Sequence, residues 1–484
     1  MNYLYKYFKQ ARVICFSITL AISFLLFFIA HAQDTIHQWE SPTKITNSGN
    51  FAPQPFMVSD SSGVLHAIWS EGVLVQNDQR TDTIYYASWD GNRWSRPLDI
   101  YAVPEGGRAV STRIRIDQHG YLHAMWVSNI DGLVYAKKHI SQSNDFRSWK
   151  MTFFPESAWV GDLAISPDGN KIFIIYSQDQ SGLYLIRSLD DGNNWSSPIN
   201  IWESTEGNDT IDRSRIEMSK DGILHVAWDV MTAERQWNPD SVGYARSLDD
   251  GSTWQDYKII QEPSSQVSIG FDEDGAMHLF WNNTATDPNG RFHMLSRDNG
   301  FTWSPMERIF IGYRGLTKLG AFAQDGDGIL HLIFAANPPD QGTPSIFHTY
   351  WDKTYWHEPE LISGDLIKTE GPAVAIIAGK NIHALWFTYE QNDWGIWHTW
   401  TTIQASSLEL QTIPTPQYTP IAELSNSIYE KKTPPSEARQ ENVVFDNIND
   451  AYQETKTSPI IPTVAGIIAA TLFIVIVVIL NKRR

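Results

Sequence analysis

The residues best suited to chemistry are five charged side chains, each placed seven or five residues before a glycine that recurs along the chain. They are Arg113, Arg115, Asp162, Arg215 and Glu217. Arginine holds a carboxylate through two parallel hydrogen bonds, and charges on buried strands are costly unless they are paired. Two interpretations follow. The first is an ion-paired lining, in which the two arginines at the seven-residue position face the two carboxylates; the second is a site for an anion or a sugar.

The glycine that positions these residues opens a repeated motif, a turn followed by a short apolar strand that contains a histidine. Asp221 to Trp228 is the clearest copy, and a looser one runs from Asp168 to Tyr176. The histidine, or the phenylalanine that replaces it once, recurs every 50 to 57 residues. A fixed period in this range is typical of a solenoid, a propeller or an array.

Each repeat contains four strand-like segments. In the fifth repeat they cover residues 266–271, 276–281, 291–295 and 303–309. Their short apolar or alternating patterns, bounded by turn residues, predict β-strands. The chain is therefore expected to be all-β.

The seventh repeat lacks its fourth strand, and the missing strand is found at the other end of the chain. Trp39 to Ile45 has the same Trp-x-x-Pro-x-x-Ile form as Trp94 to Ile100, a fourth strand. We expect this N-terminal strand to complete the last blade, because closing the ring removes exposed sheet edges. The prediction is a seven-bladed β-propeller over residues 33–403, with the first strand of each blade, and hence the five charged residues, lining the channel.

Three repeats carry the same eight-residue turn between the third and fourth strands. The copies are Ser188 to Trp195, Ser247 to Trp254 and Ser296 to Trp303. The aspartate can accept backbone N–H groups, the glycine takes a positive φ, and the tryptophan folds back to seal the hairpin. This Ser-x-Asp-x-Gly-x-Thr-Trp pattern resembles the Asp-box of sialidases and related β-propellers. The resemblance implies that the boxes are structural and lie away from the catalytic face.

The resemblance also suggests roles for particular residues. Sialidases bind the sugar carboxylate with three arginines, for which the candidates are Arg113, Arg215 and Arg314, and Arg115 joins them as a ligand-binding candidate. Sialidases use a tyrosine nucleophile with a glutamate beside it and an aspartate acid/base, and the matching candidates are Tyr313, Glu217 and Asp162. The chain departs from the family pattern: the Arg-Ile-Pro motif is absent, and familiar sialidases have six blades.

The six histidines of the repeat invite a metal hypothesis, which their distribution argues against. They are His66, His123, His225, His278, His331 and His383. One histidine per blade at one strand position spreads the set around a ring, far from a tetrahedral cluster. We expect packing residues that bond a neighbouring backbone, and neither a metal nor another cofactor is predicted.

The two ends of the chain predict membrane targeting. Residues 1–32, with the only cysteine, Cys15, form an expected signal peptide. Residues 404–458 are rich in Pro, Ser and Thr and are expected to form a disordered stalk. Residues 459–480 have the length of a transmembrane helix, and the basic residues 481–484 are expected in the cytoplasm. The predicted protein is a single-pass cell-membrane protein with its N-terminal domain outside.

The composition limits which classes of partner the protein can bind. A net charge of -18 argues against nucleic acid, which needs a basic surface. The leading hypothesis is a membrane-anchored extracellular propeller that binds a surface ligand, glycan or protein, at the channel face. The alternative is an exo-acting glycoside hydrolase of sialidase type that cleaves terminal acidic sugars, and a third possibility is a purely structural assembly factor.

Overall fold

The computed structural model describes most of the predicted propeller. The described residues are 37–46, 54–74, 80–104, 106–178, 182–204, 210–231, 241–260, 265–283, 290–315, 320–339, 341–389 and 394–412. The expected signal peptide, transmembrane helix, basic tail and residues 413–458 of the expected stalk lie outside them. Within the described ranges, no helix combines the length and apolarity required to cross a bilayer.

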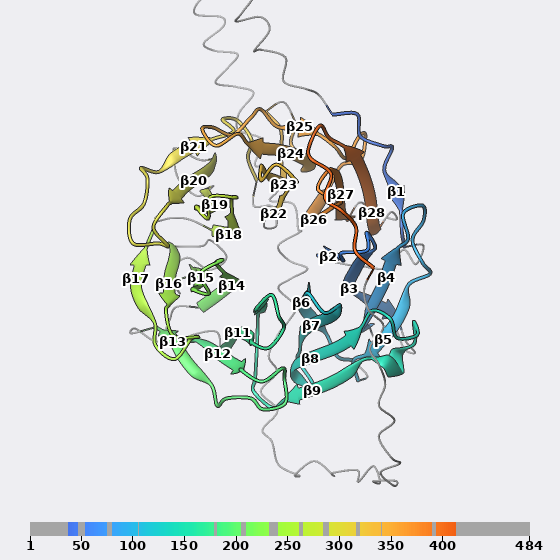
Figure 1. Ribbon diagram of the computed structural model, residues 1–484, viewed down its shortest axis with the longest axis vertical. Coiled ribbons are helices and arrows are strands. Elements are labelled where there is room, and N and C mark those ends of the chain that lie inside the picture. The colour runs from blue at the N-terminus through green and yellow to red at the C-terminus, as the bar shows by residue number, and fades with distance from the viewer. Residues whose placement is uncertain are drawn as a thin grey trace, which may run out of the picture. The chain divides into compact units, whose positions relative to one another are not determined.

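Seven antiparallel four-stranded sheets follow one another around a central axis (Figure 1). Blade 1 contains β2 (Phe56–Ser59), β3 (Leu65–Leu74), β4 (Arg80–Trp89) and β5 (Leu98–Ala102). Blade 2 contains β6 (Ala109–Ile116), β7 (Tyr121–Ser128), β8 (Gly132–His139) and β9 (Lys150–Phe154), with the 3-10 helix η2 (Phe146–Ser148) before its last strand. Blade 3 contains β10 (Gly161–Ile165), β11 (Ile172–Gln178), β12 (Gly182–Ser188) and β13 (Ile199–Glu203).

The remaining blades repeat this order. Blade 4 contains β14 (Thr210–Met218), β15 (Leu224–Met231), β16 (Ser241–Ser247) and β17 (Gln255–Ile259). Blade 5 contains β18 (Ser265–Phe271), β19 (Met277–Asn283), β20 (Gly290–Ser296) and β21 (Glu307–Ile309). Blade 6 contains β22 (Ala321–Gln324), β23 (Leu330–Ala336), β24 (Ser345–Trp351) and β25 (Glu360–Leu361). Blade 7 contains β26 (Thr369–Ile377), β27 (Asn381–Thr388), β28 (Gly395–Thr402) and β1 (Thr43–Lys44). The all-β, seven-bladed prediction is confirmed.

The ring is closed by the N-terminal strand, as the sequence predicts. In the β1–β28 pair, Thr43 lies opposite His398 and Lys44 opposite Trp397. The backbone N–H of Glu40 also donates to the carbonyl of Trp400 at 2.9 Å. The two ends of the propeller are therefore joined within one sheet, and β1 supplies the outer strand of blade 7.

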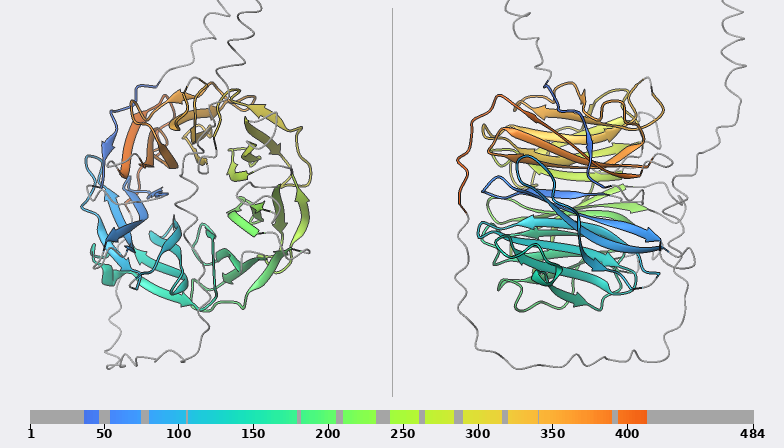
Figure 2. Two further views of the ribbon diagram at one scale, coloured as in Figure 1. Left: turned by 180° about the vertical axis from the view of Figure 1, so that it is seen from behind. Right: turned by 90° about the vertical axis from the view of Figure 1, so that its right-hand side faces the viewer.

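The apolar core lies between adjacent blades. One cluster joins Ile68 and Tyr86 of blade 1 to Ile114 and Trp126 of blade 2. Across the whole core, the second strands of the blades supply the largest side chains. Five of their tryptophans are fully buried: Trp69, Trp126, Trp228, Trp281 and Trp386. Each such side chain contributes roughly 1.5–3 kcal/mol of hydrophobic free energy. Each blade is therefore held by its neighbours, and the inner strands are fixed around the axis (Figure 2).

The Asp-box turns lie where the third and fourth strands meet. The Asp249 carboxylate accepts the backbone N–H of Thr253 at 2.9 Å and its hydroxyl at 2.7 Å. Gly251 has a φ of 79°. The tryptophan does more than seal its own hairpin, because Trp303 of blade 5 packs on Tyr244 of blade 4 with ring centroids 5.1 Å apart. The boxes therefore join neighbouring blades.

The repeated histidines form buried hydrogen-bond networks. His123 is bonded through Nε2 to the Asp117 carboxylate at 3.2 Å and through Nδ1 to the Tyr135 hydroxyl at 2.7 Å. In blades 5, 6 and 7 a histidine replaces the tyrosine, which gives the pairs His278–His293, His331–His348 and His383–His398. The packing role is as expected, but the partners are side chains and not the neighbouring backbone.

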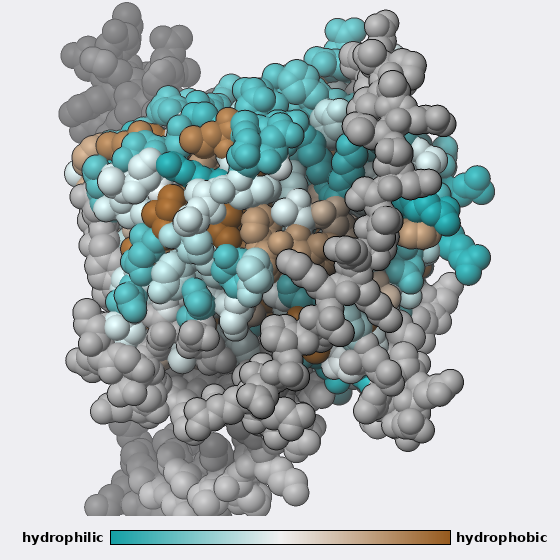
Figure 3. All heavy atoms as spheres, turned by 90° about the horizontal axis from the view of Figure 1, so that it is seen from below, coloured by the Kyte–Doolittle hydropathy of each residue, from teal (hydrophilic) through white to brown (hydrophobic). Residues whose placement is uncertain are grey.

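The start of the segment expected to be a stalk runs along the propeller. The N–H of Leu408 donates to the carbonyl of Ala378 at 2.9 Å, and that of Gln411 donates to the carbonyl of Ser61 at 2.7 Å. Residues 404–412 therefore contact the first-hairpin turns of blades 7 and 1. Figure 3 shows the outer edge of the ring, where hydrophilic and apolar residues are interspersed.

Candidate functional site in the central channel

β-Bulges on the inner strands position the channel side chains. Ser111 in β6 and Gln266 in β18 have φ values of 54° and 59°, in the left-handed region that non-glycine residues seldom adopt. The strand register shifts across each of them, between Val110 and Arg113 in β6 and between Ser265 and Ser268 in β18. Such bulges re-aim the side chains that follow. The bulges therefore set which residues face the channel.

A cavity of about 100 Å³ lies in the channel and is lined from the inner strands of all seven blades. One arc, from blades 2 to 5, is largely polar: its lining residues are Arg115, Asp162, Arg215, Glu217, Ser268 and Ile269. The other arc, from blades 6, 7 and 1, is mostly apolar: its lining residues are Gly320, Ala321, Phe322, Gly371, Pro372, Ala373, Val374, Gln54, Phe56 and Met57. The site is therefore amphipathic. It is smaller than the 150 Å³ cavity that takes a benzene ring.

The deepest charges form one closed ion-pair network. Arg113 donates from Nε to Asp162 Oδ1 at 2.7 Å, and an Nη1 of Arg215 lies 3.6 Å from Asp162 Oδ2. The N–H groups of Leu163 and Ile216 donate to the same carboxylate at 2.9 and 3.1 Å. Burial would raise the pKa of Asp162, but the neighbouring arginines outweigh it and hold that pKa below its usual value. Asp162 therefore stays ionised and fully bonded.

An aromatic ring of the adjacent blade 1 lies against the arginines. The guanidinium carbon of Arg113 lies 4.1 Å from the ring centroid of Phe56, and that of Arg215 lies 5.8 Å from it. A cation over an aromatic face is attracted by the negative potential of the ring. Phe56 of blade 1 thus bounds the polar arc and helps to stabilise its positive charge.

A second ion pair is more open to solvent. Arg115 donates from Nη2 to Glu217 Oε1 at 2.7 Å, and the two side chains are 24% and 31% exposed. Burial raises the pKa of Glu217 despite the opposing charge of Arg115. Arginine has five N–H donors, and only one hydrogen bond of Arg115 is made within the described residues. Within the part of the chain that the structure describes, its other donors have no hydrogen-bond partner and can bind a ligand.

Ser268 of blade 5 lies seven residues before its turn glycine, the same register as Arg113, Asp162 and Arg215. Its side chain is 1% exposed and lines the cavity, yet its hydroxyl has no hydrogen-bond partner among the described residues. A buried polar group without a partner is costly. The shared register with Arg113, Asp162 and Arg215 was the signal that could have identified it.

The structure does not bring Tyr313 and Arg314 to this cavity, since neither is among its lining residues. Tyr313 packs in an aromatic cluster, with its ring centroid 5.1 Å from that of Phe347. The backbone of Arg314 pairs with that of Asn337 and its carbonyl accepts from Arg291. The candidate third arginine and candidate nucleophile are thus separate from the charges of blades 2 to 4.

Comparisons with known proteins identify the fold. No family model and no curated protein matches the sequence. A polysaccharide lyase of family PL25, an ulvan lyase, matches with a TM-score of 0.52 and 12% identity over 76% of this chain and 97% of that one, and a second structure of it holds -[GlcA(1-4)Rha3S]-.

Sialidases are also among the structural neighbours. A Hadza microbial sialidase has a TM-score of 0.43 and 18% identity over 75% of this chain and 68% of its own. The intramolecular trans-sialidase from Ruminococcus gnavus has a TM-score of 0.44 and 12% identity over 77% of this chain and 99% of its own. At 12% identity, the match to the ulvan lyase concerns the fold alone.

Proposed function

We propose that this protein is a carbohydrate-binding propeller that recognises an acidic group of a surface glycan in its central channel. The observation that carries the proposal is that one cavity holds both the open Arg115–Glu217 pair and the Ser268 hydroxyl, which has no hydrogen-bond partner among the described residues. Arginine N–H groups and a hydroxyl are suitable donors for a carboxylate or a sulfate. The apolar arc beside them suits the less polar face of a sugar ring.

The size of the cavity limits what enters it. At about 100 Å³ it takes a group smaller than benzene. A carboxylate or sulfate with its attached carbon fits this limit, whereas a whole oligosaccharide does not. The remaining sugars would lie outside the cavity on the channel face. A solved structure of the ulvan lyase, which has the same general fold, is bound to -[GlcA(1-4)Rha3S]-. Such a fold is therefore compatible with a saccharide ligand.

Binding is better supported than hydrolysis of terminal acidic sugars. A glycosidase needs a general acid that carries a proton and a nucleophile or base. Asp162 is held ionised by buried arginines, and Tyr313 is not a lining residue of the cavity. Glu217 is the one lining carboxyl group of the described residues whose pKa is raised, and it is paired with Arg115. Sugar release therefore remains the alternative that the experiment must test.

The proposal places the binding domain outside the cell. It combines the expected signal peptide, residues 1–32, with the expected stalk and membrane helix, residues 404–458 and 459–480. A propeller carried on such a stalk would reach ligands away from the membrane. Protease digestion of intact cells would test this arrangement, because only an external propeller would be cleaved.

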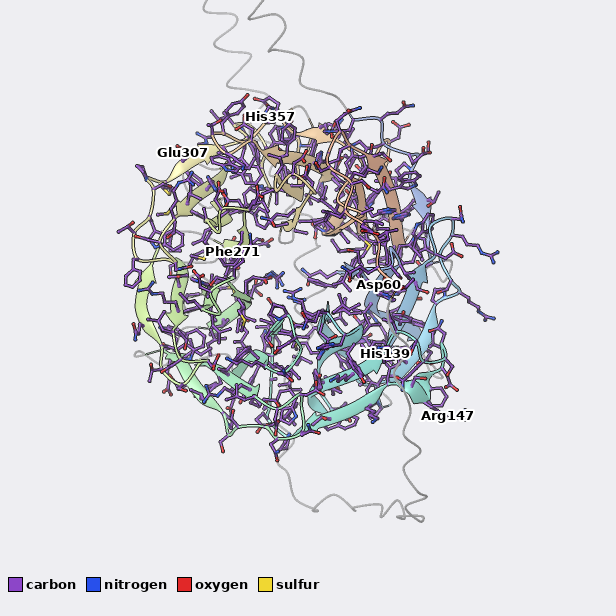
Figure 4. The ribbon with its side chains drawn as sticks, viewed as in Figure 1. Asp60, His139, Arg147, Phe271, Glu307 and His357 are labelled. Atoms are coloured by element: carbon purple, nitrogen blue, oxygen red, sulfur yellow. The ribbon has the colours of Figure 1, made fainter. Side chains whose placement is uncertain are left out.

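The test exposes the full-length chain to a mixed pool of acidic and neutral glycans. Retained glycans are identified after pull-down, and released sugars are followed by mass spectrometry. We expect retention of acidic glycans without release, lost in Arg115→Ala and kept in Arg147→Ala. Arg147 is a matched control, since its side chain is 76% exposed and lies at the outer edge of the ring (Figure 4). Release of a terminal sugar would instead establish the hydrolase.

A further inference from the structure

A compact set of potential metal ligands lies where the N-terminal segment crosses blade 6, well apart from the charged residues of the channel. His37 precedes β1, His348 lies on β24 and Glu360 lies on β25. One potential ligand atom from each lies within 4.8 Å of the others. The Nδ1 atoms of both histidines lie 2.7 Å from the same oxygen, Glu360 Oε1.

We propose that His37, His348 and Glu360 bind one first-row divalent metal ion of the zinc type. Two imidazole nitrogens and one carboxylate oxygen form a ligand set that zinc accepts, with a fourth position left for water. Zinc–ligand distances of about 2.0–2.1 Å place tetrahedral ligand atoms about 3.3 Å apart. The nitrogen–oxygen separations of 2.7 Å therefore need only a small outward movement to admit the ion.

The surroundings of the three ligands suit a metal. His348 is 1% exposed, whereas His37 and Glu360 are 13% and 17% exposed, so an ion can enter from one side. Trp39 Nε1 donates to Glu360 Oε1 at 3.0 Å and so helps to hold the carboxylate between the two histidines.

The second layer of contacts orients His348 for coordination. Its Nε2 lies 2.9 Å from His331 Nδ1, and His331 Nε2 lies 3.3 Å from the Asp325 carboxylate. A carboxylate–histidine chain behind a ligating histidine is the usual support of such sites. If the metal binds His348 Nδ1, both His348 and His331 can be neutral with the proton on Nε2. His348 then donates to His331, and His331 donates to Asp325. Without the metal, the contact between His348 Nδ1 and Glu360 also needs a proton, so two neutral imidazoles have two N–H groups for three hydrogen bonds.

Blade 5 has the same core without the complete ligand set, and so provides an internal control. His278 and His293 are bonded to each other at 2.9 Å, and Glu307 lies opposite His293 in the strand register, as Glu360 lies opposite His348. Glu307 is exposed and stands at the outer edge of the ring (Figure 4). No histidine among the described residues plays the part of His37 there. Glu307 thus has the same residue type and position without the site.

The site would fasten the closure of the ring. His37 belongs to the chain segment that leads into β1, and β1 completes blade 7. A bound ion would tie this segment to β24 and β25 of blade 6, so the N-terminal strand would be held by two blades instead of one. Since a ligand that binds only the folded state stabilises it, metal should raise resistance to unfolding.

The test uses the full-length chain without an affinity tag, stripped of metal by a chelator and then given Zn²⁺. We expect one zinc per chain after dialysis and a melting temperature several degrees higher. His37→Ala also removes a direct hydrogen bond between the N-terminal segment and Glu360, so the quantity to compare is the zinc-dependent rise in melting temperature of each variant. Glu360→Gln, which keeps a hydrogen-bond acceptor, provides a second variant. Both should lose the rise and bind zinc at least tenfold more weakly, whereas Glu307→Gln should behave as the unaltered protein.

Co²⁺ provides an independent measurement, because tetrahedral coordination by nitrogen and oxygen gives it a visible absorption band. That band should appear at one equivalent and vanish in His37→Ala. Failure to retain zinc, or equal zinc binding by the unaltered protein and both ligand variants, would overturn the proposal. Neither result bears on the glycan site, which shares no residue with this one.

Discussion

Two arginines that lie two residues apart on β6 each pair with a carboxylate from another blade, and the two pairs differ in burial and not in distance. Arg113–Asp162 and Arg115–Glu217 both have nitrogen–oxygen separations of 2.7 Å. The side chains of the first pair are 4% and 1% exposed, and those of the second are 24% and 31% exposed. Asp162 also accepts two backbone N–H groups. The first pair cannot exchange partners without leaving a buried charge uncompensated, whereas the second can.

Charged residues of one propeller channel can therefore have different roles. The deep pair supports the inner strands, and the open pair is available for a ligand. Variants that affect one pair and spare the other test this division.

The largest effect is expected for Asp162→Asn. This change leaves the buried Arg113 and Arg215 without their carboxylate, which should cost about 3–5 kcal/mol of unfolding free energy. Urea unfolding at pH 7 measures the loss. Glu217→Gln is the matched control and should cost less than about 1 kcal/mol. Equal losses in the two variants would remove the distinction between the pairs.

The cost of Asp162→Asn should depend on pH. Because the folded-state pKa of Asp162 lies below its usual value, its carboxylate contributes stability that is present above the unfolded-state pKa and is lost as pH falls through the folded-state pKa. The difference between the variant and the unaltered protein should therefore shrink on acidification below about pH 4. A difference that stays constant to pH 2 would mean that the ion pair is not its source.

Arg115→Ala should reverse the pattern of Asp162→Asn. Loss of its charged hydrogen bonds should weaken acidic-glycan binding about 10- to 100-fold, while unfolding free energy changes by less than about 1 kcal/mol. Calorimetric titration and urea unfolding of the same preparation measure both quantities. Arg147→Ala should change neither, and a stability loss in Arg115→Ala comparable with that in Asp162→Asn would contradict the account.

Glu217→Gln should strengthen binding, since Glu217 competes with the ligand for Arg115. We expect a several-fold gain in affinity at pH 7. In the unaltered protein, affinity for the acidic group should rise as pH falls toward the raised pKa of Glu217, because the protonated carboxyl group releases Arg115. The variant should lack this rise. Weaker binding by the variant would indicate that Glu217 contacts the ligand directly.

The smallest effect is expected for Ser268→Ala. Its hydroxyl has no partner within the described structure, so stability should be unchanged or slightly higher. Binding should fall about 3- to 10-fold through the loss of one neutral hydrogen bond. A marked loss of stability would show that this hydroxyl has a structural role.

The overall architecture could be predicted from the sequence because its signals are local and repeated. Seven copies of the glycine–strand motif predict seven blades, and the Trp-x-x-Pro-x-x-Ile form shared by Trp39 to Ile45 and Trp94 to Ile100 predicts that the N-terminal strand completes the last one. Glycine-relative register also identified the five channel charges. Asp162 pairs with both Arg113 and Arg215 as the ion-paired interpretation expects, although Glu217 pairs with Arg115 instead.

Other features could not be predicted because they depend on non-local packing or unusual backbone. Ser111 and Gln266 adopt positive φ at the bulges, where the residue type would not suggest it. Tyr313 was matched by residue type and loop position alone, and its aromatic cluster draws it away from the cavity. Similarly, His37 lies outside the repeat that the metal argument considered, so its meeting with His348 and Glu360 appears only in the folded chain.

The most direct test of the central claim is a calorimetric titration of the full-length protein with a retained acidic saccharide and with the same saccharide after its acidic group has been reduced or removed. The account predicts that only the acidic form binds, that Arg115→Ala abolishes most of this binding, and that Arg147→Ala does not. Equal affinity for the two saccharides, or equal binding by the two arginine variants, would contradict recognition of an acidic group in the channel.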